Sequence, residues 1–363
     1  MNRVATADPL PVPGYEAMLG FLRSPAAHAA YAAAGAPVQA IETHMSWVFL
    51  VGEHALKLKK PVRHPFLDFS TLAAREFYCR EELRLNARLA PGVYLGVMAL
   101  QWRGGRFALI PEPPADGCTV DWLVRMRRLP AARMLDRAIA QALVGRSEID
   151  ALVRMLGAFY RSVPVIDLEP ADWAARFEQD LALGRDLLLR PQFQLRDAAT
   201  ALDRYGRALS RCRGALDERA LRGRIVDGHG DLRPEHVCLI EPPVVIDCLE
   251  FNAQLRQVDP FDEIAFLGLE CEMAGAAWIG PQLAAGCAMA LGDAPPAALM
   301  HLYSAGRALL RARLAVAHLL DPQPRMAQKW QPLAERYLAR CLARLSALER
   351  GDAFSAATSR GNP

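Results

Sequence analysis

Short, largely apolar β-like segments alternate with polar turns between residues 38 and 128. A period of two is typical of β-strands that bury one side, and turn residues such as Gly52 and Glu53 separate the segments. The β-like segments are VQAIET (38–43), SWVFLVG (46–52), HALKLKK (54–60), RFALI (106–110) and TVDWLVRM (119–126). The pattern predicts a small antiparallel sheet in the first third of the chain.

Helical patterns surround and follow this sheet. One helix interrupts the strands: it begins near Ser70 or Thr71, both favoured N-cap residues, and ends at Pro91 and Gly92. From Ala131 onward the sequence is rich in Ala, Leu and Arg and predicts helices. The predicted helices cover residues 131–144, 147–162, 172–190, 196–213, 282–292, 297–320 and 326–349.

One polar segment interrupts the helical part, GHGDLRPEHVCLIEPPVVIDCLEF, which covers residues 228–251. Its apolar runs HVCLI and VVIDCLEF predict two strands, with Pro242 and Pro243 at the turn between them. The predicted fold class is therefore α+β, with a small antiparallel sheet and one helix followed by a large, mostly helical part.

Composition and charge narrow the range of partners. The 363 residues are 52% hydrophobic and carry a formal net charge of +3, with acidic and basic residues interspersed along the chain. No basic stripe is present that would neutralise a phosphate backbone, so we expect no nucleic-acid partner. The N-terminal segment holds Asp8 and three prolines where a secretory signal would be apolar, and no run is long enough to span a membrane. We expect a cytoplasmic protein without a membrane partner, and the sequence does not indicate its oligomeric state.

The segment 228–251 carries the candidate chemistry. Asp231 lies in a loop after a Gly-rich turn, and Asp247 lies near the end of the second predicted strand. Phosphoryl transfer needs one carboxylate that orients and deprotonates an attacking hydroxyl, and another that holds the magnesium bridging the phosphates. We therefore expect Asp231 and Asp247 to converge on one triphosphate.

HGDLRPEHV followed by VVIDCLEF resembles the catalytic loop and the metal-binding strand of the aminoglycoside phosphotransferase family, whose usual form is H-G-D-x-x-x-x-N followed by I-D. These enzymes are relatives of the protein kinases. Further segments resemble a bacterial subgroup often fused to a C-terminal P-loop ATPase domain. These segments are ETHMSWVFLVG, KLKKPV, FLDFSTL, EELRLNARLAPGVYLGV and VRMRRLP. The resemblance covers roughly residues 35–270. No G-x-x-x-x-G-K-[ST] occurs in this sequence, so we expect the ATPase domain to be missing.

The resemblance implies a bilobal protein-kinase-like fold and an ATP-dependent phosphotransferase that uses Mg²⁺, with Mn²⁺ as an alternative. Its partner would be a small molecule with a hydroxyl group, since family members phosphorylate aminoglycosides, choline, sugars and other small alcohols. In that fold we expect a nucleotide-binding lobe at 1–125, a hinge at 126–130, a helical lobe at 131–350 and a disordered tail at 351–363. Aminoglycoside resistance does not follow from the family name.

Residue by residue, Asp231 matches the catalytic aspartate, Asp247 the aspartate that binds the metal on the nucleotide, and His229 the structural loop histidine. His236 stands where the family has the metal-binding asparagine, and imidazole suits Mg²⁺ poorly. One-metal chemistry, a preference for Mn²⁺ or lost activity could follow. Alternatively, a neutral His236 only bonds the loop backbone.

HALK has the spacing of the V-A-I-K strand that carries the phosphate-binding lysine in kinases. Lys57 and Lys59 share one face of this strand, and we choose Lys57 over Lys59. On the helix after Ser70, Glu82 lies on an apolar, inward face, whereas Glu81 shares its face with arginines. Glu82 is therefore the expected partner of the lysine, because an inward carboxylate needs a cation.

Two further contacts to the nucleotide are expected. No G-x-G-x-x-G is present, and the polar turn at 43–46 could meet the phosphates instead, with Ser46 as the main contact. The VRMRRLP segment fits the hinge, where the backbone of Met126 would bind a nucleobase edge. VDPFDEIAFL resembles the family's structural G-D-P-x-x-D segment, so we expect Asp259 and Asp262 to brace the catalytic loop.

Two alternatives remain open beside the phosphotransferase. A pseudokinase or nucleotide-binding scaffold would explain the missing asparagine and glycine loop. A metal-dependent hydrolase would use His229, Asp231, His236 and Asp247 as zinc ligands in an H-x-D arrangement, but it would leave Lys57 and Glu82 without a role.

Overall fold

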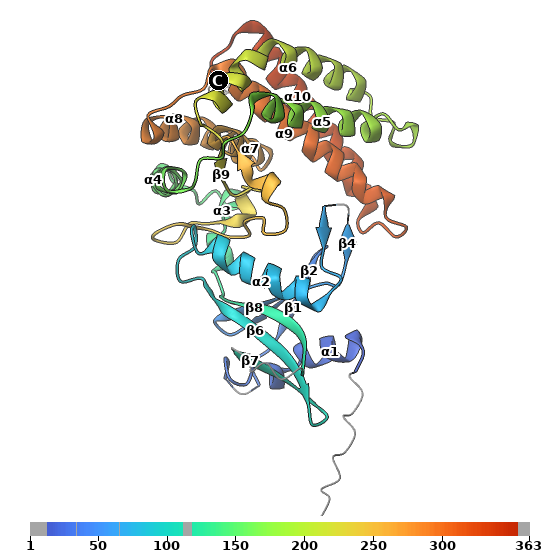
Figure 1. Ribbon diagram of the computed structural model, residues 1–363. Coiled ribbons are helices and arrows are strands. Elements are labelled where there is room, and N and C mark those ends of the chain that lie inside the picture. The colour runs from blue at the N-terminus through green and yellow to red at the C-terminus, as the bar shows by residue number, and fades with distance from the viewer. Residues whose placement is uncertain (1–12, 34, 65, 112–117, 355–363) are drawn as a thin grey trace, which may run out of the picture. The chain divides into compact units, whose positions relative to one another are not determined.

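The computed structural model describes residues 13–33, 35–64, 66–111 and 118–354 (Figure 1). Contacts divide the chain into two compact units, one of residues 1–130 with 244–253 and the other of residues 131–243 with 254–363. The segment Val244–Ala253 thus groups with the sheet, although the sequence places it within the helical part. The predicted disordered tail lies mostly outside the described residues.

A six-stranded antiparallel sheet forms the centre of the first unit (Figure 1). Its strands, in spatial order, are β1 (Gln39–Glu42), β2 (Ser46–Val51), β3 (His54–Lys59), β8 (Thr119–Arg127), β6 (Tyr94–Arg103) and β7 (Arg106–Pro111). A separate small hairpin joins β4 (Arg63–His64) and β5 (Leu67–Asp68). The sequence analysis did not predict β6, most of which is apolar on both faces.

The two faces of β3 carry different chemistry because side chains alternate along a strand. Leu56 and Leu58 are fully buried in the core that the sheet forms with α1 (Tyr15–Leu22). Lys57 and Lys59 point to the opposite face, which α2 (Leu72–Asn86) covers (Figure 1). The α2 helix begins as predicted: the Thr71 hydroxyl accepts a hydrogen bond from the N–H of Ala74.

Helices dominate the second unit. They are α3 (Leu135–Ala140), α4 (Arg146–Ser162), α5 (Pro170–Leu188), α6 (Ala198–Leu221), α7 (Pro260–Met273), α8 (Ile279–Leu291), α9 (Ala297–Ala317) and α10 (Ala327–Arg350). The α3 helix is shorter than the predicted 131–144, and α7 was not predicted. Every residue from Pro260 to Cys271 is buried, so α7 lacks the amphipathic pattern by which a surface helix is identified.

The polar segment departs from the predicted pair of long strands. Only β10 (Val237–Cys238) and β11 (Val244–Val245) are extended, together with a short pairing of β9 (Val226–Asp227) with β12 (Gln257–Val258). Asp247 has a φ of +64°, and a residue in the left-handed region cannot continue a strand. The predicted strand VVIDCLEF therefore ends before its aspartate.

The α+β class predicted from the sequence is confirmed, with an antiparallel sheet in the first unit and helices in the second. Within the described ranges, none of the helices has both the length and the apolar character needed to cross a bilayer.

Candidate functional site

A buried carboxylate of α7 holds the loop that contains Asp231. Glu263 accepts hydrogen bonds from the His229 N–H, at 3.0 Å and 3.1 Å to its two oxygens, and from the Gly230 N–H. The Tyr160 hydroxyl donates a third contact at 2.8 Å. A Cβ on Gly228 would lie 2.7 Å from a Glu263 oxygen, so only glycine lets the loop approach this closely.

Sequence reasoning assigned this bracing role to Asp259 and Asp262, and the structure gives it to the neighbouring Glu263 instead. Asp259 caps α7 and pairs with Arg219 at 2.6 Å and 2.9 Å. Asp262 pairs with Arg307 at 2.7 Å and 2.9 Å. Both pairs tie α7 to neighbouring helices rather than to the loop.

The Asp231 carboxylate lies against a guanidinium group. Its Oδ2 is 2.9 Å from Arg233 Nε and 2.8 Å from Arg233 Nη2, and the side chain is 26% exposed. Burial by itself would raise the pKa of Asp231, but the charge of Arg233 and the nearby imidazoles of His236 and His229 outweigh it and lower the pKa. Asp231 is therefore held ionised and in a fixed position.

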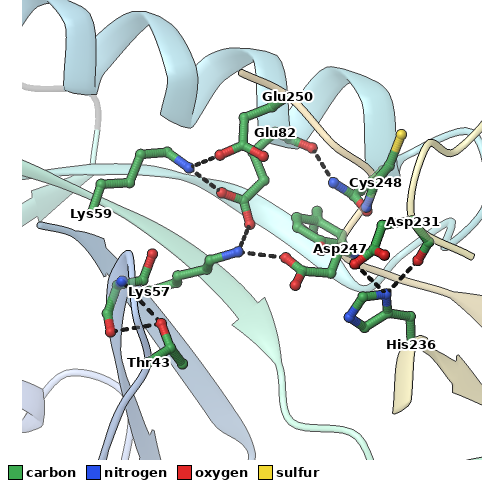
Figure 2. Close-up of polar contacts among 12 residues, drawn as sticks. Thr43, Lys57, Lys59, Glu82, Asp231, His236, Asp247, Cys248 and Glu250 are labelled. Atoms are coloured by element: carbon green, nitrogen blue, oxygen red, sulfur yellow. Dashed lines mark hydrogen bonds and ion pairs between the residues drawn. The ribbon is translucent and has the colours of Figure 1, made fainter. Parts of the chain in front are cut away.

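His236 braces the backbone of the same loop. Its Nδ1 lies 2.8 Å from the carbonyl oxygen of Asp231 (Figure 2). Its Nε2 lies 3.4 Å from Arg233 Nη2. One ring nitrogen is thus used by the backbone, and the other faces a cationic group that would repel a metal ion. This geometry favours the alternative in which His236 bonds the loop over its expected role as a metal ligand.

Replacing the guanidinium should change the titration of Asp231. In Arg233→Gln we expect the pKa of Asp231 to rise, because burial then acts with less opposition from positive charge. Carboxyl ¹³C chemical shifts, followed by NMR over a pH titration, measure this pKa without requiring activity. Arg222→Gln is the matched control, because Arg222 pairs with Glu218 on the surface of α6. An unchanged Asp231 pKa in Arg233→Gln would contradict this account.

A chain of alternating charges lies within the first unit (Figure 2). Lys57 Nζ is 2.5 Å from Asp247 Oδ1 and 2.9 Å from Glu82 Oε1. Lys59 Nζ is 2.6 Å from Glu82 Oε2 and also contacts Glu250. The side chains of Glu82 and Lys59 are both fully buried. Glu82 therefore bridges the two lysines, each through a different oxygen.

These contacts distinguish Glu82 from Glu81 and Lys57 from Lys59, which the sequence left as alternatives. Glu81 forms a pair with Arg84 at the exposed side of α2, whereas Glu82 faces inward. Lys57 touches the 45% exposed Asp247, whereas Lys59 lies between two buried carboxylates. Lys57 is therefore the lysine with a solvent-facing partner. Sequence reasoning missed Glu250, whose only signal is a charge within the otherwise apolar CLEF.

The backbone around Asp247 is fixed by neighbouring elements. The Asp247 N–H donates to the Tyr94 hydroxyl at 3.2 Å, and the Cys248 N–H donates to Asn86 Oδ1 at 2.9 Å. These contacts hold Asp247 in its left-handed conformation, which costs a residue other than glycine about 1–3 kcal/mol. Strain of this kind is tolerated where it positions a functional side chain.

The residues present fit a magnesium ion at Asp247. Its half-exposed carboxylate offers the hard oxygen that Mg²⁺ prefers, and Mg²⁺ on a nucleotide needs only one or two protein carboxylates. In the part of the chain that the structure describes, no three His, Cys, Asp or Glu side chains are arranged to hold a metal by themselves. The imidazole of His236 does not fit, for the reasons above.

The other two expected nucleotide contacts are not favoured by the geometry. Ser46 is buried, and its N–H donates a hydrogen bond to Thr43 Oγ1 at 2.9 Å. This N–H is therefore used within the turn and does not point at a phosphate. Met126 lies inside β8 and pairs with Ala55 of β3 on one side and Tyr94 of β6 on the other. Its backbone is therefore part of the ladder and is not presented as a hinge edge.

Comparisons with known proteins extend this picture. No protein-family model matches the chain. Uncharacterized proteins of Mycobacterium tuberculosis and Mycobacterium bovis are 33% identical over 303 residues, which cover 79% of this chain and 56% of those proteins. The chain thus spans about half the length of the curated relatives it matches.

Two solved structures are similar in fold at low sequence identity. A choline kinase from Cryptosporidium parvum has a TM-score of 0.55 at 10% identity, with 93% of this chain and 97% of that chain covered. A choline/ethanolamine kinase family protein from Mesorhizobium loti has a TM-score of 0.51 at 16% identity, with 92% and 98% covered. Both likenesses extend over nearly the whole length of each chain.

Proposed function

We propose that this chain, which has the protein-kinase-like fold of the choline and ethanolamine kinases, is an ATP-dependent phosphotransferase for a hydroxyl group of a small molecule. One observation carries the proposal: Lys57 joins Glu82 of α2 to Asp247 at 2.9 Å and 2.5 Å. A lysine–glutamate pair beside a metal-competent aspartate is the phosphate-binding arrangement of kinases. The HGD loop adds Asp231 as the proton acceptor.

Each residue has a defined part in the proposed reaction. Asp231 orients the acceptor hydroxyl and takes its proton on a carboxylate oxygen as the hydroxyl oxygen bonds to phosphorus. Lys57 binds phosphate oxygens, and Asp247 would hold the magnesium ion. ATP would supply the phosphoryl group: the bond between its γ-phosphorus and the oxygen that bridges to the β-phosphate would break, and ADP would leave. The proposal includes the expectation that Asp231 and Asp247 act on the same triphosphate.

The residues around Asp231 suit this part. The lowered pKa keeps the carboxylate ionised well below neutral pH, so it can accept a hydrogen bond from a hydroxyl. A base of such low pKa is weak, so orientation of the hydroxyl is its main contribution, as suits a loose phosphoryl-transfer transition state.

A nucleotide-binding pseudokinase is the second candidate. The observation that favours it is His236, which stands at the position of the second metal ligand and bonds the backbone instead. The zinc hydrolase has less support, because His236 Nδ1 contacts the Asp231 carbonyl and His229 Nδ1 accepts a hydrogen bond from the Asp231 N–H at 3.2 Å.

A thermal-shift series with ATP and Mg²⁺, Mn²⁺ or Zn²⁺, followed by a screen of hydroxylated metabolites for ATP consumption, tests the three candidates. The phosphotransferase predicts stabilisation by magnesium or manganese ATP and turnover with at least one acceptor. Binding without turnover across a broad acceptor set would favour the pseudokinase. Stabilisation by zinc alone would favour the hydrolase.

Asp247→Ala should weaken binding of magnesium ATP. Removal of a charged ligand is expected to lower the affinity on the order of 10- to 100-fold, because a charge-assisted contact contributes about 1.5–3 kcal/mol. Isothermal titration calorimetry with ATP in the presence and absence of Mg²⁺ measures this loss. Asp68→Ala serves as a control, since Asp68 lies on the exposed hairpin of β4 and β5. Wild-type affinity in Asp247→Ala would contradict the assigned role.

A further inference from the structure

We propose that Lys59 and Glu250 are positioning residues that hold Glu82 permanently, so that Lys57 is free to leave Asp247 for the phosphates of a nucleotide. The inference rests on the proposed function, because it assigns different roles to Lys57 and Lys59 at that site. Neither Lys59 nor Glu250 would touch the nucleotide.

The first step is the way in which Glu82 is shared. Its Oε1 lies 2.9 Å from Lys57 Nζ, and its Oε2 lies 2.6 Å from Lys59 Nζ (Figure 2). The two lysines therefore use separate oxygens and do not compete for one. If Lys57 moves away, Glu82 keeps a short ion pair with Lys59.

The second step is burial. Glu82 and Lys59 are 0% exposed and Glu250 is 7% exposed. Removing one partner of a buried ion pair is strongly destabilising, because the remaining charge stays in a medium of low dielectric. With a single lysine, any movement of that lysine toward a ligand would leave Glu82 uncompensated. Lys59 removes this cost.

The third step is the difference between the two lysines. Lys59 is enclosed by Glu82, Glu250 and the ring of Phe69, whose centroid lies 4.9 Å from its Nζ. Lys57 instead contacts Asp247, which is 45% exposed. A half-exposed carboxylate can exchange a lysine for water or a metal ion at little cost. Lys57 is thus the mobile cation and Lys59 the fixed one.

The fourth step is the connection among three parts of the unit. Lys59 comes from β3, Glu82 from α2, and Glu250 from the segment 244–253 that also carries Asp247. The ion pairs of Lys59 therefore join α2 and this segment to the sheet without using Lys57. They keep Glu82 and the Asp247 backbone in place while Lys57 changes partners.

Single substitutions test whether Lys57 and Lys59 have different roles. We expect Lys57→Met to lower the affinity for magnesium ATP by more than about tenfold. It should shift the melting temperature by less than about 3 °C, because Glu82 retains Lys59. Lys59→Met leaves Glu82 and Glu250 without their shared cation, and we expect its melting temperature to fall by more than about 6 °C. Equal sensitivity at the two positions would overturn the inference.

A double variant separates positioning from stability. Lys59→Met with Glu250→Gln removes one buried cation and one buried anion together, so we expect the fold to be retained. Among the described residues, Lys57 is then the only cation paired with Glu82, and a nucleotide must compete with Glu82 for it. We expect the KM for ATP to rise about tenfold with kcat less affected. Lys59→Arg in the otherwise unchanged protein keeps a cation that can bridge Glu82 and Glu250. Its affinity for magnesium ATP should therefore stay near the wild-type value.

The control pair lies directly beside this cluster. Lys60, which follows Lys59 along the chain, pairs with Glu42 at 2.6 Å, and both are partly exposed. Lys60→Met with Glu42→Gln should leave nucleotide affinity and melting temperature near the wild-type values. Wild-type KM in the Lys59→Met, Glu250→Gln variant would overturn the proposal.

The two proposals fail in different ways. If the wild-type protein does not bind magnesium ATP, the proposed function fails, and the stability comparison alone decides the inference. A tolerated Lys57→Met beside a destabilised Lys59→Met would still support Lys59 as the fixed partner of Glu82, and the reverse order would contradict it.

Discussion

Asp231→Asn is expected to lower the rate of phosphoryl transfer about 10²- to 10⁴-fold, which is the usual contribution of a positioned proton acceptor. Asparagine has the same shape as aspartate, but it is neutral, so it orients the acceptor hydroxyl less strongly than a carboxylate and takes no proton from it. The loop should keep its conformation, because Glu263 holds its backbone at His229 and Gly230 and not through the Asp231 side chain. Nucleotide affinity should therefore remain near the wild-type value.

The measurement is ATP consumption with the acceptor found by screening, combined with calorimetric titration of magnesium ATP. Glu235→Gln is the matched control: it removes a carboxylate of the same loop that also contacts Arg233 but lies near the surface. We expect the control to keep most of its activity. Wild-type rates in Asp231→Asn, or equal losses in both variants, would contradict the role assigned to Asp231.

Glu263→Ala is expected to lower the free energy of unfolding of the second unit by about 3–5 kcal/mol, which lies in the range of buried polar groups left without partners. The substitution removes the acceptor of the His229 and Gly230 N–H groups and of the Tyr160 hydroxyl. Backbone N–H groups that lose their partner inside a protein cost free energy comparable to a lost hydrogen bond each. The loss should also misplace Asp231.

Chemical denaturation followed by circular dichroism measures this stability. Tyr160→Phe removes only one of the three donors and should cost about 1 kcal/mol. Glu272→Ala is the control on the same helix, because Glu272 forms partly exposed pairs with Arg340 and Arg344 and should contribute less than about 1 kcal/mol. A Glu263→Ala variant as stable as Glu272→Ala would refute the bracing role.

The pH dependence provides a second readout for Glu263. Burial raises its pKa above the ordinary value, against the opposing effect of the Gly230 and His229 N–H groups and the Tyr160 hydroxyl. A carboxyl whose pKa is raised in the folded state binds its proton more tightly there, so its contribution to stability falls as the pH increases from about 4.5 through the folded pKa. The stability difference between wild type and Glu263→Gln should therefore decrease over this interval.

Local patterns in the sequence determined the elements that carry the ion-paired residues Lys57, Lys59 and Glu82. Alternation along HALKLKK places both lysines on one face of β3, and helical spacing places Glu82 inward on α2, as the structure has them. The choice between Lys57 and Lys59 was open at that level, because the period of two treats them alike. Their different partners, Asp247 and Glu250, separate them only in three dimensions.

The tertiary structure alone decided the contacts that support the site. Glu263 lies in α7, a helix that is buried nearly all round and therefore carries no amphipathic signal, and it is 33 residues from the Gly230 N–H that it binds. Glu250 is likewise 191 residues from Lys59. A sequence pattern reports which face of its own element a residue occupies, because that depends only on local geometry. The partner across the interior depends on how distant segments pack, and for buried charges that packing determines which ionised groups are stable.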